Sequence, residues 1–290
     1  MRVERWPVLR GMVYHPRKHP RLSPAAVGLS SDFVREVATR TTEGITLRGW
    51  LWLPRPHKAP ADSDCDNQVG NGPKVVYFPG RGGHRGFRVL EVGILTALGA
   101  EVLLFDYRGY ADNPGRPSEE GLAHDARAAW EFAQHELHWS RDDILLYGES
   151  LGGALAIQLA AEESRRGHPP AGILLRSTFT SFTEAACHLW PPLRWILPTD
   201  WYPSRQRIGQ MSCPVLIMHG ELDRLVPFTM GRELFESAPA KSASGIERRL
   251  VPLRNSEHNH AAVTDGPTMR QAVVQFLCDV TRSHTVSRPG

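Results

Sequence analysis

The sequence predicts an α/β fold in which helices cover both faces of a mostly parallel central sheet. From residue 74 onwards, short apolar runs alternate with longer helical patterns up to the end of the chain. Strands that alternate with helices pair in parallel through right-handed crossovers, and such sheets are buried on both faces. The chain is 41% hydrophobic and 22% charged, which is ordinary for a globular protein and excludes a disordered chain or a coiled coil. Its 290 residues fit one such domain with insertions.

The first predicted elements are an antiparallel strand pair near the start of the chain. Residues 34–39 and 45–53 alternate or run apolar around the turn Glu43-Gly44, which is typical of a hairpin at the edge of a sheet. We take residues 1–33 as an N-terminal extension. Residues 54–73 then consist mainly of Pro, Asp, Asn and Gly, so we predict a solvated loop there.

The remaining elements follow as strand and helix in turn. The apolar runs predict strands at residues 75–78, 102–105, 144–147, 173–175, 215–218 and 249–253. Helical patterns lie at residues 86–98, 118–138, 151–165, 228–236 and 267–281. Ser118, followed by two glutamates, is a typical helix start, because a serine cap and early acids suit the positive end of a helix dipole. The domain is therefore expected at residues 34–281, with residues 282–290 as a C-terminal tail.

One interval breaks this alternation. Residues 178–211 contain Trp190, Trp195 and Trp201 together with several prolines, so no long helix can form there. We predict a short cap insertion over the strand ends, whose three tryptophans would form a wall for an apolar ligand. Packing of the insertion against its own domain is the alternative interpretation of the same residues.

The chemistry is expected at Gly148-Glu149-Ser150-Leu151-Gly152, a G-x-S-x-G motif between a predicted strand and a predicted helix. In this context the motif predicts a tight, strained turn that lifts the hydroxyl of Ser150 out of the sheet. The two glycines are needed because a Cβ at either position would collide with neighbouring backbone. The amide of Leu151 would point at the same space from a helix N-terminus and could bind an oxyanion.

A serine nucleophile needs a base to take its proton and an acid to orient that base. Asp223 and His258 each follow one of the later predicted strands, so both are expected at the same edge of the sheet as Ser150. Along the chain, the nucleophile then comes first, the acid second and the base third, which is the order that usually accompanies a G-x-S-x-G turn. His260 is the competing base, whereas we interpret His219 as a packed, hydrogen-bonded histidine.

Four stretches taken together identify a family resemblance. They are Tyr77-Phe78-Pro79-Gly80-Arg81-Gly82-Gly83, Phe105-Asp106-Tyr107-Arg108-Gly109-Tyr110, Gly148 to Gly153, and His219-Gly220 with Asp223 and Val226-Pro227. From about Val34 to Thr281 the chain resembles the α/β-hydrolase family, and within it the branch of protein depalmitoylases and related serine hydrolases with a serine-aminopeptidase-type domain. The resemblance implies the α/β-hydrolase fold with a Ser-His-Asp triad.

The resemblance also implies a second oxyanion donor, the backbone amide of Arg81. The family usually has His-Gly-Asn at this place, where the chain has Pro79-Gly80-Arg81. Asp106 and Arg108, by the same resemblance, belong to a structural turn held by charge-assisted hydrogen bonds. Membrane-bound members of the branch carry a hydrophobic anchor or a lipidated cysteine cluster, and neither is expected here.

We therefore expect a serine hydrolase that cleaves a small-molecule carboxylic ester or thioester through an acyl-enzyme, without a metal or an organic cofactor. An amidase or peptidase using the same triad is the alternative, and a non-catalytic binding module on a hydrolase fold is a third. Ester chemistry is favoured because the cap offers no evident acidic cluster beyond Glu184 and Asp200 to hold a free amino terminus. The oligomeric state is left open.

Charge and cysteine content argue against other classes. The chain has 34 Lys and Arg against 31 acidic residues, and the basic residues are scattered, so no nucleic-acid partner is expected. The four cysteines show no C-x-x-C spacing, so we expect reduced thiols in a cytoplasmic protein rather than a zinc site or a disulfide framework. The longest stretch without charged residues, 208–220, is too short to span a bilayer. No secretory signal is recognised.

Overall fold

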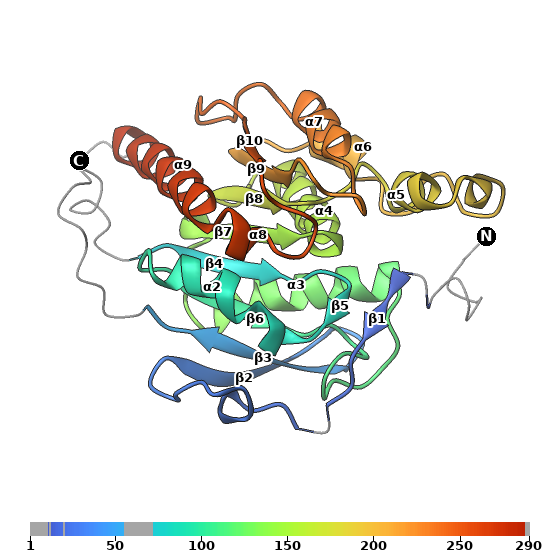
Figure 1. Cartoon of the computed structure of the whole chain (residues 1–290). Coiled ribbons are helices and arrows are strands. Elements are labelled where there is room, and N and C mark those ends of the chain that lie inside the picture. The colour runs from blue at the N-terminus through green and yellow to red at the C-terminus, as the bar shows by residue number, and fades with distance from the viewer. Residues whose placement is uncertain (1–10, 12, 20, 55–71, 288–290) are drawn as a thin grey trace.

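The computed structural model describes residues 11, 13–19, 21–54 and 72–287, with side chains up to residue 283. Almost all of the loop predicted at residues 54–73 lies outside the described residues. The termini of the described chain lie on opposite sides of the molecule (Figure 1).

The described part of the chain is built around an eight-stranded sheet of order β10-β9-β8-β7-β4-β6-β3-β2. Its strands are β2 (Val34–Arg40), β3 (Thr46–Trp52), β4 (Lys74–Phe78), β6 (Glu101–Phe105), β7 (Ile144–Glu149), β8 (Gly172–Arg176), β9 (Val215–Gly220) and β10 (Arg249–Leu253). The pairs β2–β3 and β3–β6 are antiparallel, and the other pairs of this sheet are parallel. The predicted α/β fold with a mostly parallel sheet is confirmed.

Two hydrophobic cores lie on the two faces of this sheet, because side chains alternate along each strand. Val76 of β4 belongs to the core that also contains residues of α3 (Glu119–His135), α4 (Leu151–Arg165) and α7 (Phe228–Ser237). Its neighbour Val75 belongs to the other core, with residues of α2 (Val89–Thr96), α8 (Ala261–Thr264) and α9 (Gly266–Ser287). Because the strands from β10 to β6 run parallel, their C-terminal ends lie at one edge of the sheet, where the connecting loops gather.

Several boundaries differ from the sequence prediction. Helix α9 continues to Ser287, whereas the apolar pattern ends at Thr281, because further turns need only backbone hydrogen bonds and no apolar face. The helix predicted at residues 86–98 is divided into a 3-10 turn, η3 (Arg85–Arg88), and the shorter α2.

The N-terminal segment contributes a strand that the sequence analysis did not predict. Strand β1 (His15–Pro16) pairs in parallel with β5 (Gly82–Gly83), which follows β4. The segment taken as an N-terminal extension is therefore attached to the loop in which an oxyanion donor is expected.

The interval after β8 forms helix α5 (Phe182–Leu189), the 3-10 turn η5 (Pro191–Trp195) and helix α6 (Ser204–Ile208). Figure 1 shows α5 and the turn after it projecting from the body at the right. Prolines at the start of η5 limit these elements to short lengths, as expected from the sequence.

Asp106 and Arg108 lie outside the site, in two buried ion pairs at the end of β6. Asp106 accepts hydrogen bonds from the backbone amide of Arg85 at 2.7 Å and from its guanidinium at 2.5 Å. Arg108 donates to Asp125 through its side chain at 2.9 Å and through its amide at 2.8 Å. These contacts fix a turn, as interpreted from the sequence.

Among the cysteines that the structure describes, the prediction of reduced thiols is wrong at Cys278. Cys278 is disulfide-bonded, whereas Cys187 and Cys213 are free. Pairing depends on the distance between two cysteines in the fold, and sequence spacing does not reveal it.

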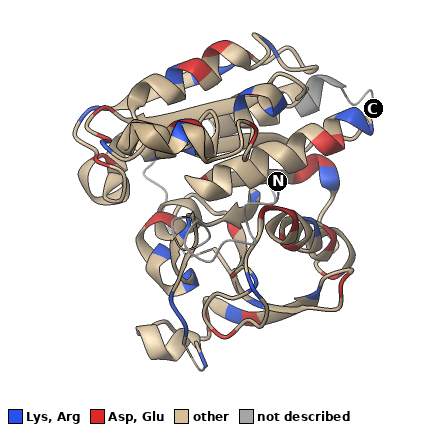
Figure 2. Ribbon diagram, turned by 90° about the vertical axis from the view of Figure 1, so that its right-hand side faces the viewer, with Lys and Arg blue, Asp and Glu red and all other residues tan. Residues whose placement is uncertain are grey.

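Charged residues of both signs are interspersed over the helices, without a basic stripe (Figure 2). Among the described helices, none combines the length and the apolar character that crossing a bilayer requires.

Candidate active site

Ser150 occupies the single residue between the end of β7 and the start of α4. Its backbone has φ 50° and ψ −113°, a conformation that residues with a side chain rarely adopt. The strained backbone is held from both sides, because the Ser150 amide donates to the carbonyl of Arg176 at 2.9 Å and the Thr178 hydroxyl donates to the Ser150 carbonyl at 2.7 Å. The turn therefore projects the serine side chain beyond the edge of the sheet.

The glycines of the motif allow this turn to pack closely. A Cβ at Gly148 would lie 2.5 Å from the Cα of Gly153, and a Cβ at Gly152 would lie 1.9 Å from the carbonyl oxygen of Phe78. Both obstacles are backbone atoms, which cannot rotate away. The second contact places the start of α4 directly against the end of β4.

Three side chains from different strand ends form one hydrogen-bonded row at this edge. His258 lies between β10 and α8, with Nδ1 2.7 Å from Oδ2 of Asp223 and Nε2 3.1 Å from the hydroxyl of Ser150. Asp223 lies just after β9, and its other oxygen accepts the amides of Leu225 at 2.9 Å and Val226 at 2.8 Å. All three members of the row are buried. Sequence reasoning selected these three residues, and the structure brings them together.

The charge of Asp223 determines which nitrogen of His258 carries the proton. Burial would raise the pKa of Asp223, but hydrogen bonds from His258 and the Val226 amide outweigh burial and lower this pKa below its ordinary value. An ionised carboxylate only accepts hydrogen bonds, so Nδ1 of neutral His258 must donate. Nε2 is then left with a lone pair directed at the Ser150 hydroxyl, which is the arrangement a general base requires.

The other two histidines near the row are placed differently. His219 is fully buried, lies 2.8 Å from the Val226 carbonyl through Nε2, and has a pKa that burial lowers to about 4. This placement agrees with the interpretation of a packed, hydrogen-bonded side chain. His260 is exposed at the start of α8, and its contacts in the structure are made by its backbone carbonyl.

Hydrogen bonds to its backbone carbonyl groups hold the loop after β4 in place. The Tyr107 hydroxyl donates to the carbonyl of Pro79, the Tyr110 hydroxyl donates to the carbonyl of Arg81, and both distances are 2.8 Å. The amide of His15 in β1 also donates to the Arg81 carbonyl, at 3.1 Å. The loop thus has a fixed backbone orientation beside Ser150. Arg81 and Leu151, the two expected oxyanion donors, line one cavity together with Ser150.

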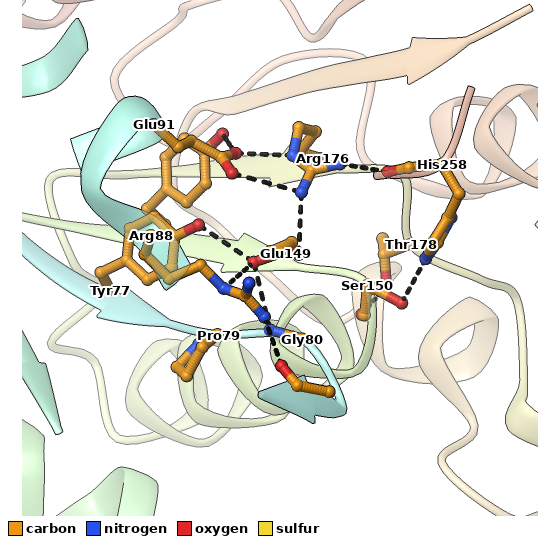
Figure 3. Close-up of polar contacts among 12 residues, drawn as sticks. Tyr77, Pro79, Gly80, Arg88, Glu91, Glu149, Ser150, Arg176, Thr178 and His258 are labelled. Carbon is orange, nitrogen blue, oxygen red and sulfur yellow. Dashed lines mark hydrogen bonds and ion pairs between the residues drawn. The ribbon is translucent and has the colours of Figure 1, made fainter. Parts of the chain in front are cut away.

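Glu149, next to Ser150, is the centre of a buried ion network (Figure 3). Its carboxylate lies 2.6 Å from Nε of Arg88 and 2.9 Å from Nη2 of Arg176, and it accepts the amide of Gly80 at 3.3 Å and the Tyr77 hydroxyl at 3.1 Å. Burial opposes the ionisation of Glu149, but the two guanidinium groups outweigh burial and lower its pKa to about 2. Glu149 is therefore a structural anion rather than an acid catalyst.

The two arginines carry this network to the loops on either side of Ser150 (Figure 3). Arg176 donates to the backbone carbonyl of His258 at 2.8 Å and also pairs with Glu91 at 2.5 Å. Arg88 donates to the carbonyl of Gly82 at 2.9 Å. One set of buried charges thus joins the loop that contains His258 to the loop that contains an expected oxyanion donor.

Two cavities of opposite character meet at Ser150. The smaller one, about 110 Å³, is lined mostly by apolar side chains, namely Phe179, Phe182, Ala185, Ala186, Leu189, Trp190, Leu193, Leu225 and Val226, together with Arg81 and Leu151. The larger one, about 670 Å³, also includes Ser150 and His258. Its wall combines polar and basic groups such as His15, Arg17, Arg88 and His260 with the carboxylates of Glu91 and Glu149 and with the apolar side chains of Phe87, Leu90 and Val263. A substrate with an apolar part and a polar part could therefore place its reacting carbonyl between them.

The three tryptophans predicted to form the wall have three different positions. Trp190 lines the apolar cavity. Trp195 is 79% exposed and stacks against Arg194, whose guanidinium lies 4.8 Å from the ring centre. Trp201 is 4% exposed and packs against Phe182 with ring centres 5.0 Å apart. Only Trp190 of the predicted three lies at the cavity, and Trp201 fits the alternative of packing against the domain.

Sequence reasoning missed the ion network and most of the cavity wall. The available signal was the occurrence of Glu149 and Arg176 as lone charges at the ends of two otherwise apolar strands. Phe179 and Phe182 offered a second signal, because they begin the cap interval directly after β8. Within the described ranges, no group of three or more His, Cys, Asp or Glu side chains is placed to hold a metal ion.

Comparisons with known proteins identify relatives of this chain. The family described as serine aminopeptidase, S33, matches residues 72–199. An uncharacterized protein of Mycobacterium tuberculosis is 38% identical over 276 residues, covering 94% of this chain and 89% of that protein. Lysophosphatidylserine lipase ABHD12 of Danio rerio is 32% identical over 223 residues, covering 71% of this chain and 58% of the lipase.

A solved structure shares the fold. The esterase Pf2001 of Pyrococcus furiosus superposes with a TM-score of 0.66 at 17% identity, covering 91% of this chain and 96% of the esterase. The family match, the lipase relatives and the shared fold all point to one family. This protein belongs to the α/β-hydrolase family.

Proposed function

We propose that this protein is a serine hydrolase that cleaves carboxylic ester or thioester bonds through an acyl-enzyme. The observation that carries the proposal is the row Asp223–His258–Ser150, whose serine opens onto both an apolar and a polar cavity. The family and its lipase relatives support ester hydrolysis in general.

In the proposed mechanism, Nε2 of His258 takes the proton of the Ser150 hydroxyl as its oxygen attacks the substrate carbonyl. Asp223 holds the imidazole in its tautomer and stabilises the cation that forms. The amides of Arg81 and Leu151 bind the negative oxygen of the tetrahedral intermediate. His258 then gives its proton to the leaving oxygen or sulfur. Water, activated by the same histidine, attacks the acyl-enzyme and releases the carboxylic acid together with free Ser150.

We further propose that the acyl group is apolar and that the leaving group is polar or anionic. The apolar cavity would take the acyl chain. On the wall of the polar cavity, Arg176 forms ion pairs with the carboxylates of Glu91 and Glu149. With these two negative charges paired, basic side chains such as Arg17 determine the charge that the wall presents to a ligand. Lysophosphatidylserine is a single-chain ester with an anionic headgroup, so the name of the lipase relatives supports the same class here.

Removal of the nucleophile tests the reaction class. The variant Ser150→Ala should lose about 10⁴-fold or more in kcat, because without a nucleophile only binding and the oxyanion donors remain. A fluorophosphonate probe should label the wild-type chain and fail to label the variant, while circular dichroism shows the same fold. Labelling of the variant at the wild-type level would disprove the assignment, and cleavage of aminoacyl anilides without any ester cleavage would favour an amidase.

The choice of base is tested with two histidines of the same loop. His258→Ala should lose nearly as much activity as the serine variant, because the members of a triad act as a unit. His260→Ala should keep most of the activity, since this exposed side chain lies outside the hydrogen-bonded row. Initial rates on an aryl ester decide between them, and the reverse ranking would transfer the role of base to His260.

The ion network should act on turnover rather than on substrate binding. Arg176→Lys keeps the charge but removes the fork that reaches Glu91, Glu149 and the His258 carbonyl together, so His258 should be held less well. We expect kcat to fall at least about tenfold with a smaller change in KM. Arg166→Lys, directly after α4, is the matched control: its partner Glu163 lies 2.5 Å away, and the variant should keep wild-type rates. Equal kcat values for the two variants at equal stability in urea would contradict this role.

The cavity assignment predicts a dependence on acyl length. Trp190→Ala should lower kcat/KM for long-chain esters more than for acetyl esters, because the indole ring packs against the acyl chain far from the carbonyl and contributes about 0.8 kcal/mol per buried methylene. Trp195→Ala is the matched control, because this side chain lies outside the cavity wall. An ester series of increasing chain length, with neutral and phosphoserine headgroups, measures both effects. A uniform loss across the series would mean that Trp190 only supports the cap.

A further inference from the structure

The cap ends in a cluster of exposed apolar side chains, which we name the cap tip, residues 189–196. Leu189 is 54% exposed, Trp190 57%, Trp195 79% and Ile196 50%. Half of the large exposed apolar side chains of the described residues thus fall within this one short segment. A contiguous exposed apolar patch on a soluble domain marks a surface that meets a partner or a membrane.

The exposure follows from a fixed turn. Leu193 is 2% exposed and Leu197 is 7% exposed, so both anchor the segment in the core while Trp195 and Ile196 point outward. The amides of Leu193 and Ile196 each donate at 3.0 Å within the turn, to the carbonyls of Trp190 and Leu193. The two prolines at the start of η5 further restrict the backbone.

The one charged side chain within the cap tip, Arg194, is basic, and Asp200 is the next charged residue after it. From residue 185 to residue 199, Arg194 is the only Lys, Arg, Asp or Glu. Just before this stretch, Glu184 is paired with Arg205 at 2.6 Å. The polar cavity beside it adds Arg17 on its wall, as described above. Exposed tryptophans next to arginine suit the boundary between lipid headgroups and acyl chains, where an amphipathic ring lies half in water and the cation meets anionic headgroups.

The cap tip is also continuous with the apolar cavity. Leu189 and Trp190 belong to the tip and to the cavity wall that includes Ser150. A protein covering the tip would therefore cover the mouth of the cavity, whereas a lipid surface in the same place would present acyl chains to it. This continuity favours a lipid surface over a second copy of the chain.

We propose that the cap tip docks on an anionic lipid surface. Trp195 and Ile196 enter the headgroup–acyl boundary, Arg194 contacts anionic headgroups, and an acyl chain passes between Leu189 and Trp190 into the cavity. The delivery of substrate rests on the proposed function, whereas the docking itself does not.

The test measures vesicle binding of full-length protein carrying Ser150→Ala, so that hydrolysis cannot alter the lipid. Co-sedimentation with phosphatidylcholine vesicles, with and without phosphatidylserine, should reveal stronger binding to the anionic vesicles. Adding Trp195→Ala and Ile196→Ala should weaken binding about tenfold or more, because less apolar surface is buried in the lipid. Arg194→Gln should weaken binding about fivefold on anionic vesicles only. Leu222→Ala, which removes a side chain that is 54% exposed outside the tip, should bind as the parent does.

A second measurement separates docking from catalysis. In the chain with an intact Ser150, Trp195→Ala with Ile196→Ala should leave the hydrolysis of a soluble butyrate ester unchanged and slow the hydrolysis of esters presented in vesicles. Vesicle binding without hydrolysis of any ester would support docking while overturning the proposed function. Equal vesicle binding by the tip variants and the parent would overturn the proposal. So would a concentration-dependent dimer, seen by ultracentrifugation without lipid and absent in the tip variants, because it would identify a second copy as the occupant.

Discussion

The buried carboxylate of Glu149 is the interaction on which the arrangement of the site depends. It lies next to Ser150 and between two guanidinium groups, one of which also holds the His258 carbonyl and the other the Gly82 carbonyl. Burying so many charges carries a large desolvation penalty, which is offset only when each charge is paired and hydrogen-bonded in good geometry. The network is therefore stable only when both loops are in place, and this makes the position of His258 and the shape of the loop after β4 interdependent.

The same edge of the sheet also offsets the backbone strain at Ser150. A non-glycine residue in the conformation of Ser150 costs about 1–3 kcal/mol, so it persists only where its surroundings over-determine it. Here the amide of Ser150 is hydrogen-bonded to the last residue of β8 and its carbonyl to Thr178 just after that strand. Gly148 allows β7 to approach the start of α4, and Gly152 allows β4 and α4 to approach to backbone contact. The segment from Arg176 to Thr178 thus serves twice, since it holds the turn through its backbone and the ion network through the arginine side chain.

How much the sequence could predict depends on whether the signal is local. The parallel sheet and the row Ser150, Asp223, His258 were predictable, because strand periodicity, the glycine-flanked turn and the chain order are patterns within short segments. The roles of Trp190, Trp195 and Trp201 were not, since a turn fixed by Leu193 and Leu197 determines which ring faces the cavity, the solvent or the core. The partners of Glu149 and Arg176 and the disulfide of Cys278 also escaped prediction, because they depend on the distance between residues remote in sequence.

The position of His258 relates the two cavities to the order of events in the proposed mechanism. The apolar cavity lies on the side of Ser150 where Leu151 and Val226 form the wall, while His258 lines the polar cavity. An acyl chain held in the apolar cavity would keep the carbonyl against Ser150 after the first bond is broken. The leaving group would then lie beside the one side chain that can protonate it, in a cavity wide enough for it to depart and for water to replace it. A division of the site by polarity would therefore orient the substrate. It would also let the leaving group depart while the acyl group stays on Ser150. His258 could then act first as the acid toward the leaving group and next as the base toward water.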